Sequence, residues 1–120
     1  MNDLTIRLLA APKAARLLRH AVREHLGDGR ACPDAELCVS ELLANVIIHL
    51  GEGTPVTLRI TGRATRTRVE LTDPEPRVWP VPRQATDGDE SGRGLALLDA
   101  VALRWGVEQG PDSKTVWCEL

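Results

Sequence analysis

The feature that most constrains the fold is a long, almost wholly apolar segment, DAELCVSELLANVIIHL, at residues 34–50. Its spacing predicts a helix that Gly51 ends. The aliphatic side chains spread over a broad face that we expect to be buried: Leu37, Leu42, Leu43, Val46, Ile47 and Leu50. Glu41, Asn45 and His49 fall at i, i+4 and i+8, so they share one side of the helix. This line of polar groups is the first candidate site.

The rest of the chain divides into further strand-like and helical segments. The strand-like segments are residues 3–9, 54–62, 65–73, 105–109 and 114–120, and the helical ones begin near Pro12, Pro33 and Gly92. The link Gly62-Arg63-Ala64 predicts a hairpin between the second and third strands. The order predicts an α/β two-layer sandwich. A mixed, mainly antiparallel sheet is covered on one face by about three helices.

One long stretch, residues 74–91, has no periodicity and holds four prolines. A loop of this length inside a compact domain is usually a lid, a binding loop or disordered. It separates the third strand from the helix that Gly92 opens. We therefore expect a single domain over residues 1–120 with a lid at 74–91.

Composition excludes several classes of protein. The 120 residues are the length of one domain and contain no Phe and no Tyr, so the core must be built from Leu, Val, Ala and Ile. A net charge of −2 and a pI near 5.9 argue against a strongly basic nucleic-acid binder. The three cysteines lack CxxC spacing, which argues against a zinc site and fits a reducing cytosol. No apolar run reaches the roughly 18 residues of a membrane span. We expect a cytoplasmic protein.

The pair Glu41 and Asn45 carries chemistry that suits a metal-assisted reaction. The amide oxygen of Asn is a suitable ligand for Mg²⁺, which prefers oxygen. Glu41, one turn earlier, is placed to orient or deprotonate a nucleophile near the same metal. The alternative is that both residues form an exposed polar edge of an amphipathic helix.

Two further features point to a nucleotide, and each has a plainer reading. Gly92-Arg93-Gly94 opens a helix, where backbone amides and a fixed positive charge favour a phosphate. Such a pattern can equally be a loop that enters a helix. Asp73 ends a strand, where its carboxylate can accept a hydrogen bond from an exocyclic amine. The alternative for Asp73 is an Asx turn.

Four motifs in order carry a family resemblance. They are Glu41-Leu-Leu-Ala-Asn45-Val-Ile-Ile-His49, Val69-Glu-Leu-Thr-Asp73, Gly92-Arg-Gly94-Leu and Lys114-Thr115-Val-Trp. Together they resemble the ATP-binding domain shared by histidine kinases, gyrase, Hsp90 and MutL, the GHKL or Bergerat fold. Within it the chain is most similar to the small anti-sigma factor and serine-protein kinase branch, in its stand-alone actinobacterial form.

The resemblance implies a role for each matched residue. Asn45 is implied to coordinate Mg²⁺ with the phosphates of ATP, and Glu41 to act as general base toward a partner serine. Asp73 is implied to read the adenine amino group. Gly92 and Gly94 are implied to wrap the phosphates, and Thr115 to lie near the adenine. The resemblance also implies that His49, Arg93 and Leu95 belong to the nucleotide site, and it leaves the role of His49 open.

The chain departs from the family where the first glycine motif follows Asp73. The family has Asp-x-Gly-x-Gly, and this chain has Asp73-Pro-Glu-Pro-Arg77. Proline lacks an amide donor and fixes φ, so the backbone of this segment cannot approach a nucleotide as closely as the glycine motif does. The acidic run at residues 87–90 adds charge that repels a triphosphate. Both features predict weakened nucleotide affinity.

The resemblance implies an ATP-binding anti-sigma regulatory factor with serine/threonine-protein kinase activity. It would sequester a sigma factor and phosphorylate an anti-anti-sigma partner of the STAS type, using ATP and Mg²⁺. A homodimer is also implied, and direct contact with nucleic acid or membrane is not. The alternative is a catalytically weak or inactive binding module that regulates by protein contact alone. A stand-alone ATPase, with water in place of the serine, is the third reading.

Overall fold

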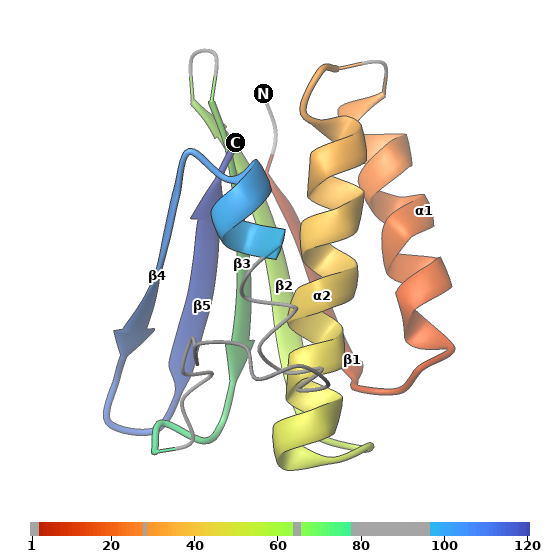
Figure 1. Cartoon of the computed structure of the whole chain (residues 1–120). Helices are drawn as coiled ribbons and strands as arrows, with labels where there is room; N and C mark the ends of the chain where they lie inside the picture. The colour runs from red at the N-terminus through yellow and green to blue at the C-terminus, as the bar shows by residue number, and fades with distance from the viewer. Residues whose placement is uncertain (1–2, 28, 64–65, 78–96) are drawn as a thin grey trace.

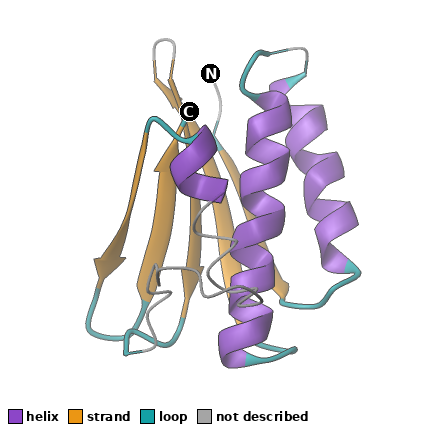
Figure 2. Cartoon of the chain, viewed as in Figure 1, coloured by secondary structure: helices purple, strands orange, loops and turns teal. Residues whose placement is uncertain are grey.

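A computed structural model of the chain describes residues 3–27, 29–63, 66–77 and 97–120, and Figure 1 shows their arrangement in two layers. The elements are β1 (Leu4–Leu9), α1 (Ala14–Leu26), α2 (Cys32–Leu50), β2 (Pro55–Arg63), β3 (Arg66–Asp73), β4 (Arg104–Gln109) and β5 (Lys114–Glu119). Residues 97–101 are also helical. The helices lie on one face of the sheet (Figure 2).

The sheet has the strand order β1-β2-β3-β5-β4, and every pairing between these strands is antiparallel. The predicted two-layer α/β sandwich is therefore confirmed. The parallel pairing that a mixed sheet would contain is absent among the described strands. β2 runs on to Arg63, which pairs with Arg66, so Gly62 belongs to the ladder and not to the turn. Residues 64–65 lie outside the described part.

Burial alternates along β3 and β5, which gives the sheet one apolar face. Their register places Val69 opposite Cys118 and Leu71 opposite Val116. At the end of the ladder the same face carries Asp73 opposite Lys114. The pairing thus delivers two charged side chains to the helix-covered side of the sheet.

Both long helices end at glycine, α1 at Gly27 and α2 at Gly51, and the sequence predicts the second of these ends. Gly51 has φ of 96°, a conformation that costs little only for glycine, and its N–H bonds to the carbonyl of Ile47 at 3.0 Å. Pro33 lies in the first turn of α2, where a missing N–H is harmless. Pro33 and Gly51 therefore mark the beginning and the end of α2.

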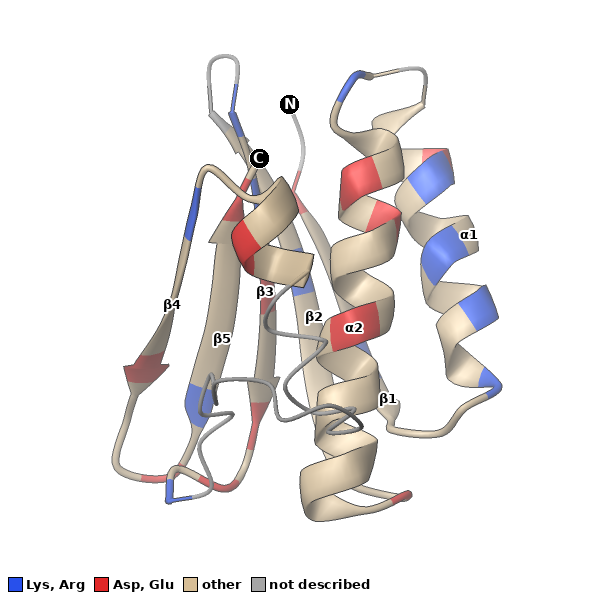
Figure 3. Cartoon of the chain, viewed as in Figure 1, with Lys and Arg blue, Asp and Glu red and all other residues tan. Residues whose placement is uncertain are grey.

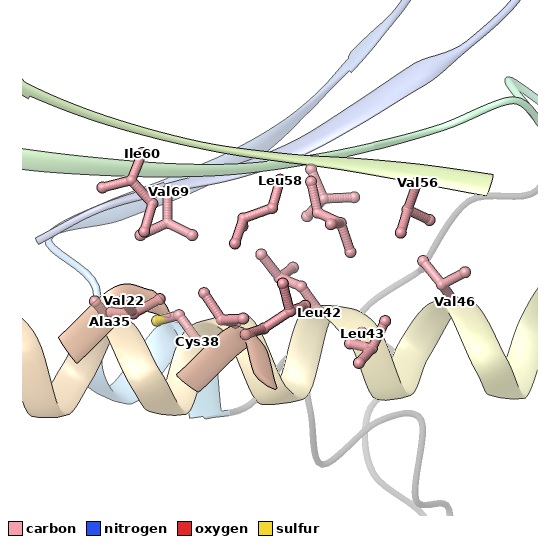
Figure 4. Packing of buried hydrophobic residues seen from close by; sticks show 14 of the residues in the cluster. Val22, Ala35, Cys38, Leu42, Leu43, Val46, Val56, Leu58, Ile60 and Val69 are labelled. Atoms are coloured by element: carbon pink, nitrogen blue, oxygen red, sulfur yellow. The ribbon is translucent and has the colours of Figure 1, made fainter. Parts of the chain in front are cut away.

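The core lies between the helices and the sheet and is aliphatic, as the missing Phe and Tyr require (Figure 4). Its largest fully buried side chains come from both layers: Leu18, Leu43, Leu58, Ile60, Leu98, Val22, Val39, Val69, Cys38 and Cys118. Because Leu98 belongs to this set, the helical residues 97–101 close the same core. None of the described helices is long and apolar enough to cross a membrane.

Candidate functional site

A cleft lies between the C-terminal half of α2 and the ends of β3 and β5. Its lining residues are Leu42, Asn45, Val46, His49, Leu50, Leu71, Asp73, Lys114 and Val116. Most of these side chains are aliphatic, so the cleft has apolar walls with a few polar groups between them. That composition is typical of a site for a small, partly apolar ligand.

Asn45 is the buried polar group that α2 contributes to this cleft. It is 6% exposed, and its Nδ2 has no hydrogen-bond partner among the described residues. A buried amide donor without an acceptor is costly, and an oxygen of a bound anion would satisfy it. Glu41 lies half-buried one turn earlier, and His49 lies exposed at the rim one turn later. The predicted polar line is therefore present along α2.

The cleft also suits the cofactors that the motifs imply. The Asn45 amide offers an oxygen to a hard cation such as Mg²⁺ and an N–H to a phosphate oxygen. Within the described ranges, no three His, Cys, Asp or Glu side chains gather into a metal site. A cation here would therefore depend on Asn45 together with oxygens of the ligand.

Asp73 forms a buried ion pair with Lys114 at the other end of the cleft. The Lys114 Nζ lies 3.0 Å from Oδ1 and 2.9 Å from Oδ2 of Asp73. The side chain of Asp73 is 2% exposed and that of Lys114 is 4% exposed. The end of β3 is acidic and the start of β5 is basic in Figure 3. The carboxylate assigned to adenine is thus already paired within the protein.

The segment after Asp73 folds back onto it. The backbone N–H of Glu75 donates to Asp73 Oδ1 at 2.9 Å, which is the Asx turn considered as the plainer reading of this residue. Lys114 Nζ donates to the carbonyl of Glu75, and Gln109 Nε2 donates to that of Pro76, both at 3.0 Å. The proline-containing departure from the family pattern is therefore a turn anchored to β4 and β5.

Thr115 lies on the other face of the sheet, away from the cleft. Its Oγ1 is 2.7 Å from Oγ1 of Thr72, which faces the same way. Lys114 occupies the cleft-facing position that the resemblance led us to expect for Thr115. Strand alternation was the available signal, because Lys114 shares a face with Val116 and Cys118.

The phosphate-wrapping motif, Gly92, Arg93, Gly94 and Leu95, lies outside the described residues, as do residues 78–91 of the expected lid.

Cys38 and Cys118 are buried and free. A hydrogen bond with Cys38, together with burial, raises the pKa of the Cys118 thiol. Cys118 is therefore a core residue and not a ready nucleophile.

Comparison with known proteins places this geometry in a family. Residues 7–119 match the histidine kinase-like ATPase domain. The chain belongs to that family, and membership implies an ATP-binding site. The uncharacterized protein SCO4941 of Streptomyces coelicolor is 57% identical over 83 residues, which are 68% of this chain and 79% of that protein.

A solved structure shares the fold at low sequence identity. It contains the RsbU and RsbW domains of Rv1364c from Mycobacterium tuberculosis, and it matches with a TM-score of 0.72 at 20% identity. The match covers 99% of this chain and 32% of the other, so the chain spans about a third of that protein. At this identity the likeness shows that the two proteins share the fold.

Proposed function

We propose that this protein is an ATP- and Mg²⁺-dependent anti-sigma regulatory factor with serine-protein kinase activity. It sequesters a sigma factor and phosphorylates a serine of a STAS-type anti-anti-sigma partner, acting in the cytoplasm. The observation that carries the proposal is the convergence of Asn45 and Asp73 on one apolar cleft. Asn45 presents a buried amide there that lacks a partner among the described residues. The family membership over residues 7–119 supports the same site.

The two polar ends of the cleft take different parts of the nucleotide. Asn45 holds Mg²⁺ and the phosphates, and Asp73 receives the amino group of adenine. The aliphatic side chains between them, Leu42, Val46, Leu71 and Val116, cover the faces of the base. When bound, Mg-ATP supplies the phosphoryl group and the cation that neutralises its charge.

Glu41 is the catalytic residue of this proposal. It lies one helical turn before Asn45 on the same side of α2 and is half-buried, next to the lining residue Leu42 and outside the lining of the cleft itself. Glu41 takes the proton of the partner's serine hydroxyl as that oxygen attacks the γ-phosphorus and displaces ADP. General-base help of this kind is worth about 10²–10⁴ in rate.

The nucleotide site is tested by calorimetric titration of Mg-ATP into the wild type and Asn45→Ala. We expect binding in the wild type and at least tenfold weaker binding in the variant. Ile48→Ala is the matched control, because Ile48 lies on the same helix and is 51% exposed. Equal affinity in all three proteins would show that Asn45 takes no part in nucleotide binding.

The kinase activity is tested by following γ-phosphate transfer to a STAS-domain partner. Glu41→Gln should slow transfer at least a hundredfold while Mg-ATP affinity stays unchanged, because only proton removal is lost. Unchanged transfer by Glu41→Gln would refute its assignment as the base.

A binding module without catalysis is the second candidate, and two observations favour it. Prolines stand at 74 and 76, and the Asp73 carboxylate is paired with Lys114. In this case Mg-ATP fails to bind at millimolar concentration, while a sigma factor still co-purifies with the protein. Homodimer formation is compatible with either candidate and is measured in the same samples by light scattering.

A further inference from the structure

The carboxylate that the proposed function assigns to the base is already engaged by Lys114. A lysine ammonium has three donor hydrogens. Lys114 Nζ lies within 3.0 Å of three acceptors, which are both carboxylate oxygens of Asp73 and the carbonyl of Glu75. Every donor of this side chain therefore has a partner inside the protein.

The acceptor side of the pair is nearly filled as well. A carboxylate offers about four acceptor positions. Lys114 uses one on each oxygen of Asp73, and the N–H of Glu75 uses another on Oδ1. With a side chain 2% exposed, Asp73 has little capacity left for an incoming amino group.

We propose that Lys114 is an internal competitor for the nucleotide base. Its ammonium holds the Asp73 carboxylate, so an adenine amino group binds only by displacing or sharing that contact, and affinity for nucleotide is lowered. The inference rests on the proposed function, because it concerns the base end of the same cleft. It assigns to Lys114 the control of nucleotide affinity.

Lys114 also ties the base end of the cleft to the segment that follows β3. The same ammonium binds the Glu75 carbonyl, and Gln109 binds the next carbonyl, that of Pro76. Displacement of Lys114 from Asp73 therefore also loosens a contact that holds this turn against β5. Nucleotide binding and the position of residues 74–77 are coupled through one side chain.

The first test is a calorimetric titration of Mg-ATP into the wild type and Lys114→Met. Methionine keeps the length of the side chain and removes the competing charge. We expect Lys114→Met to bind Mg-ATP at least tenfold more tightly and to unfold at a lower temperature, because it leaves a buried carboxylate unpaired. Lys13→Met is the matched control, since Lys13 is the other lysine of the chain and is exposed.

The possible outcomes separate this inference from the proposed function. Equal affinity in the wild type and Lys114→Met overturns the inference alone, provided that Asn45→Ala still weakens binding at least tenfold. Weaker binding by Lys114→Met also overturns it and makes Lys114 a ligand contact. Absence of binding in both proteins overturns the inference together with the proposed nucleotide site.

A second measurement uses the wild type alone. It tests whether Mg-ATP displaces Lys114 from Asp73 even if Lys114→Met does not fold. The two lysines are acetylated with an amine-reactive ester and followed separately by mass spectrometry. Lys114 should react at least tenfold more slowly than Lys13, because its ammonium is buried and paired. Saturating Mg-ATP should accelerate the labelling of Lys114 and leave Lys13 unchanged. A Lys114 rate that Mg-ATP does not raise would overturn the inference.

Discussion

On the uncovered face of the sheet, the residue at position 106 of β4 is limited by its contact with the indole ring of Trp117. A Cβ at this position would lie 2.9 Å from Cζ2 of Trp117, on the indole ring over which the Arg68 guanidinium stacks 4.4 Å from the centroid. We expect Gly106→Ala to displace this ring and lower the free energy of unfolding by about 1–3 kcal/mol. Urea denaturation followed by circular dichroism measures the loss.

Gly110 supplies the control for this prediction. It lies in the turn between β4 and β5, and a Cβ there would come no nearer than 3.4 Å to a neighbouring atom. Gly110→Ala should therefore cost less than Gly106→Ala. Equal losses in the two variants would mean that the indole ring gives way freely.

At the scale of elements, an ion pair joins α1 to α2 within the helical layer. Arg23 donates to Glu36 at 2.7 Å, and this hydrogen bond lowers the pKa of the Glu36 carboxyl below its ordinary value of 4.5. A lowered pKa in the folded state stabilises the protein above the unfolded-state pKa, and the gain is lost as pH falls through the folded-state value. We therefore expect Glu36→Gln to lower Tm at pH 7 and to have little effect near pH 3.

The measurement is a series of thermal melts between pH 7 and pH 3. Glu52→Gln is the control, because Glu52 is exposed and has no ion-pair partner among the described residues. Its Tm should follow the wild type at every pH. A Glu36→Gln deficit that stays constant down to pH 3 would contradict an electrostatic origin.

At the scale of the whole molecule, stability depends on one aliphatic core shared by the two layers. Leu43 of α2 and Leu58 of β2 are both fully buried and come from opposite sides of that core (Figure 4). With no Phe or Tyr in the chain, leucines supply the largest core volumes. We expect Leu58→Ala to lower the free energy of unfolding by about 2–5 kcal/mol, measured in urea. Leu17→Ala should cost far less, because Leu17 is 70% exposed on α1.

A comparable loss in the two leucine variants would argue against a single shared core. The denaturant slope of Leu58→Ala should match that of the wild type if the protein unfolds in one step. A changed slope would show that the substitution alters the compactness of the denatured or native state or that unfolding is no longer a single step.

Features that depend on local backbone geometry can be predicted from the amino-acid sequence. The 3.6-residue period placed Glu41, Asn45 and His49 along one side of α2, and the glycine at 51 fixed where that helix ends. The two-residue period and the turn signals gave the strands and their order along the chain. Composition fixed an aliphatic core, because no Phe or Tyr was available.

Which groups meet in the cleft depends on strand pairing, which local patterns do not contain. Asp73 and Lys114 are 41 residues apart, and they pair because β5 lies beside β3 in one particular register. Motif resemblance located the strand but favoured Thr115, one residue away from the position that faces α2. A shift of one residue moves a side chain to the opposite face of a sheet, so only the observed pairing of β3 with β5 could choose between the two.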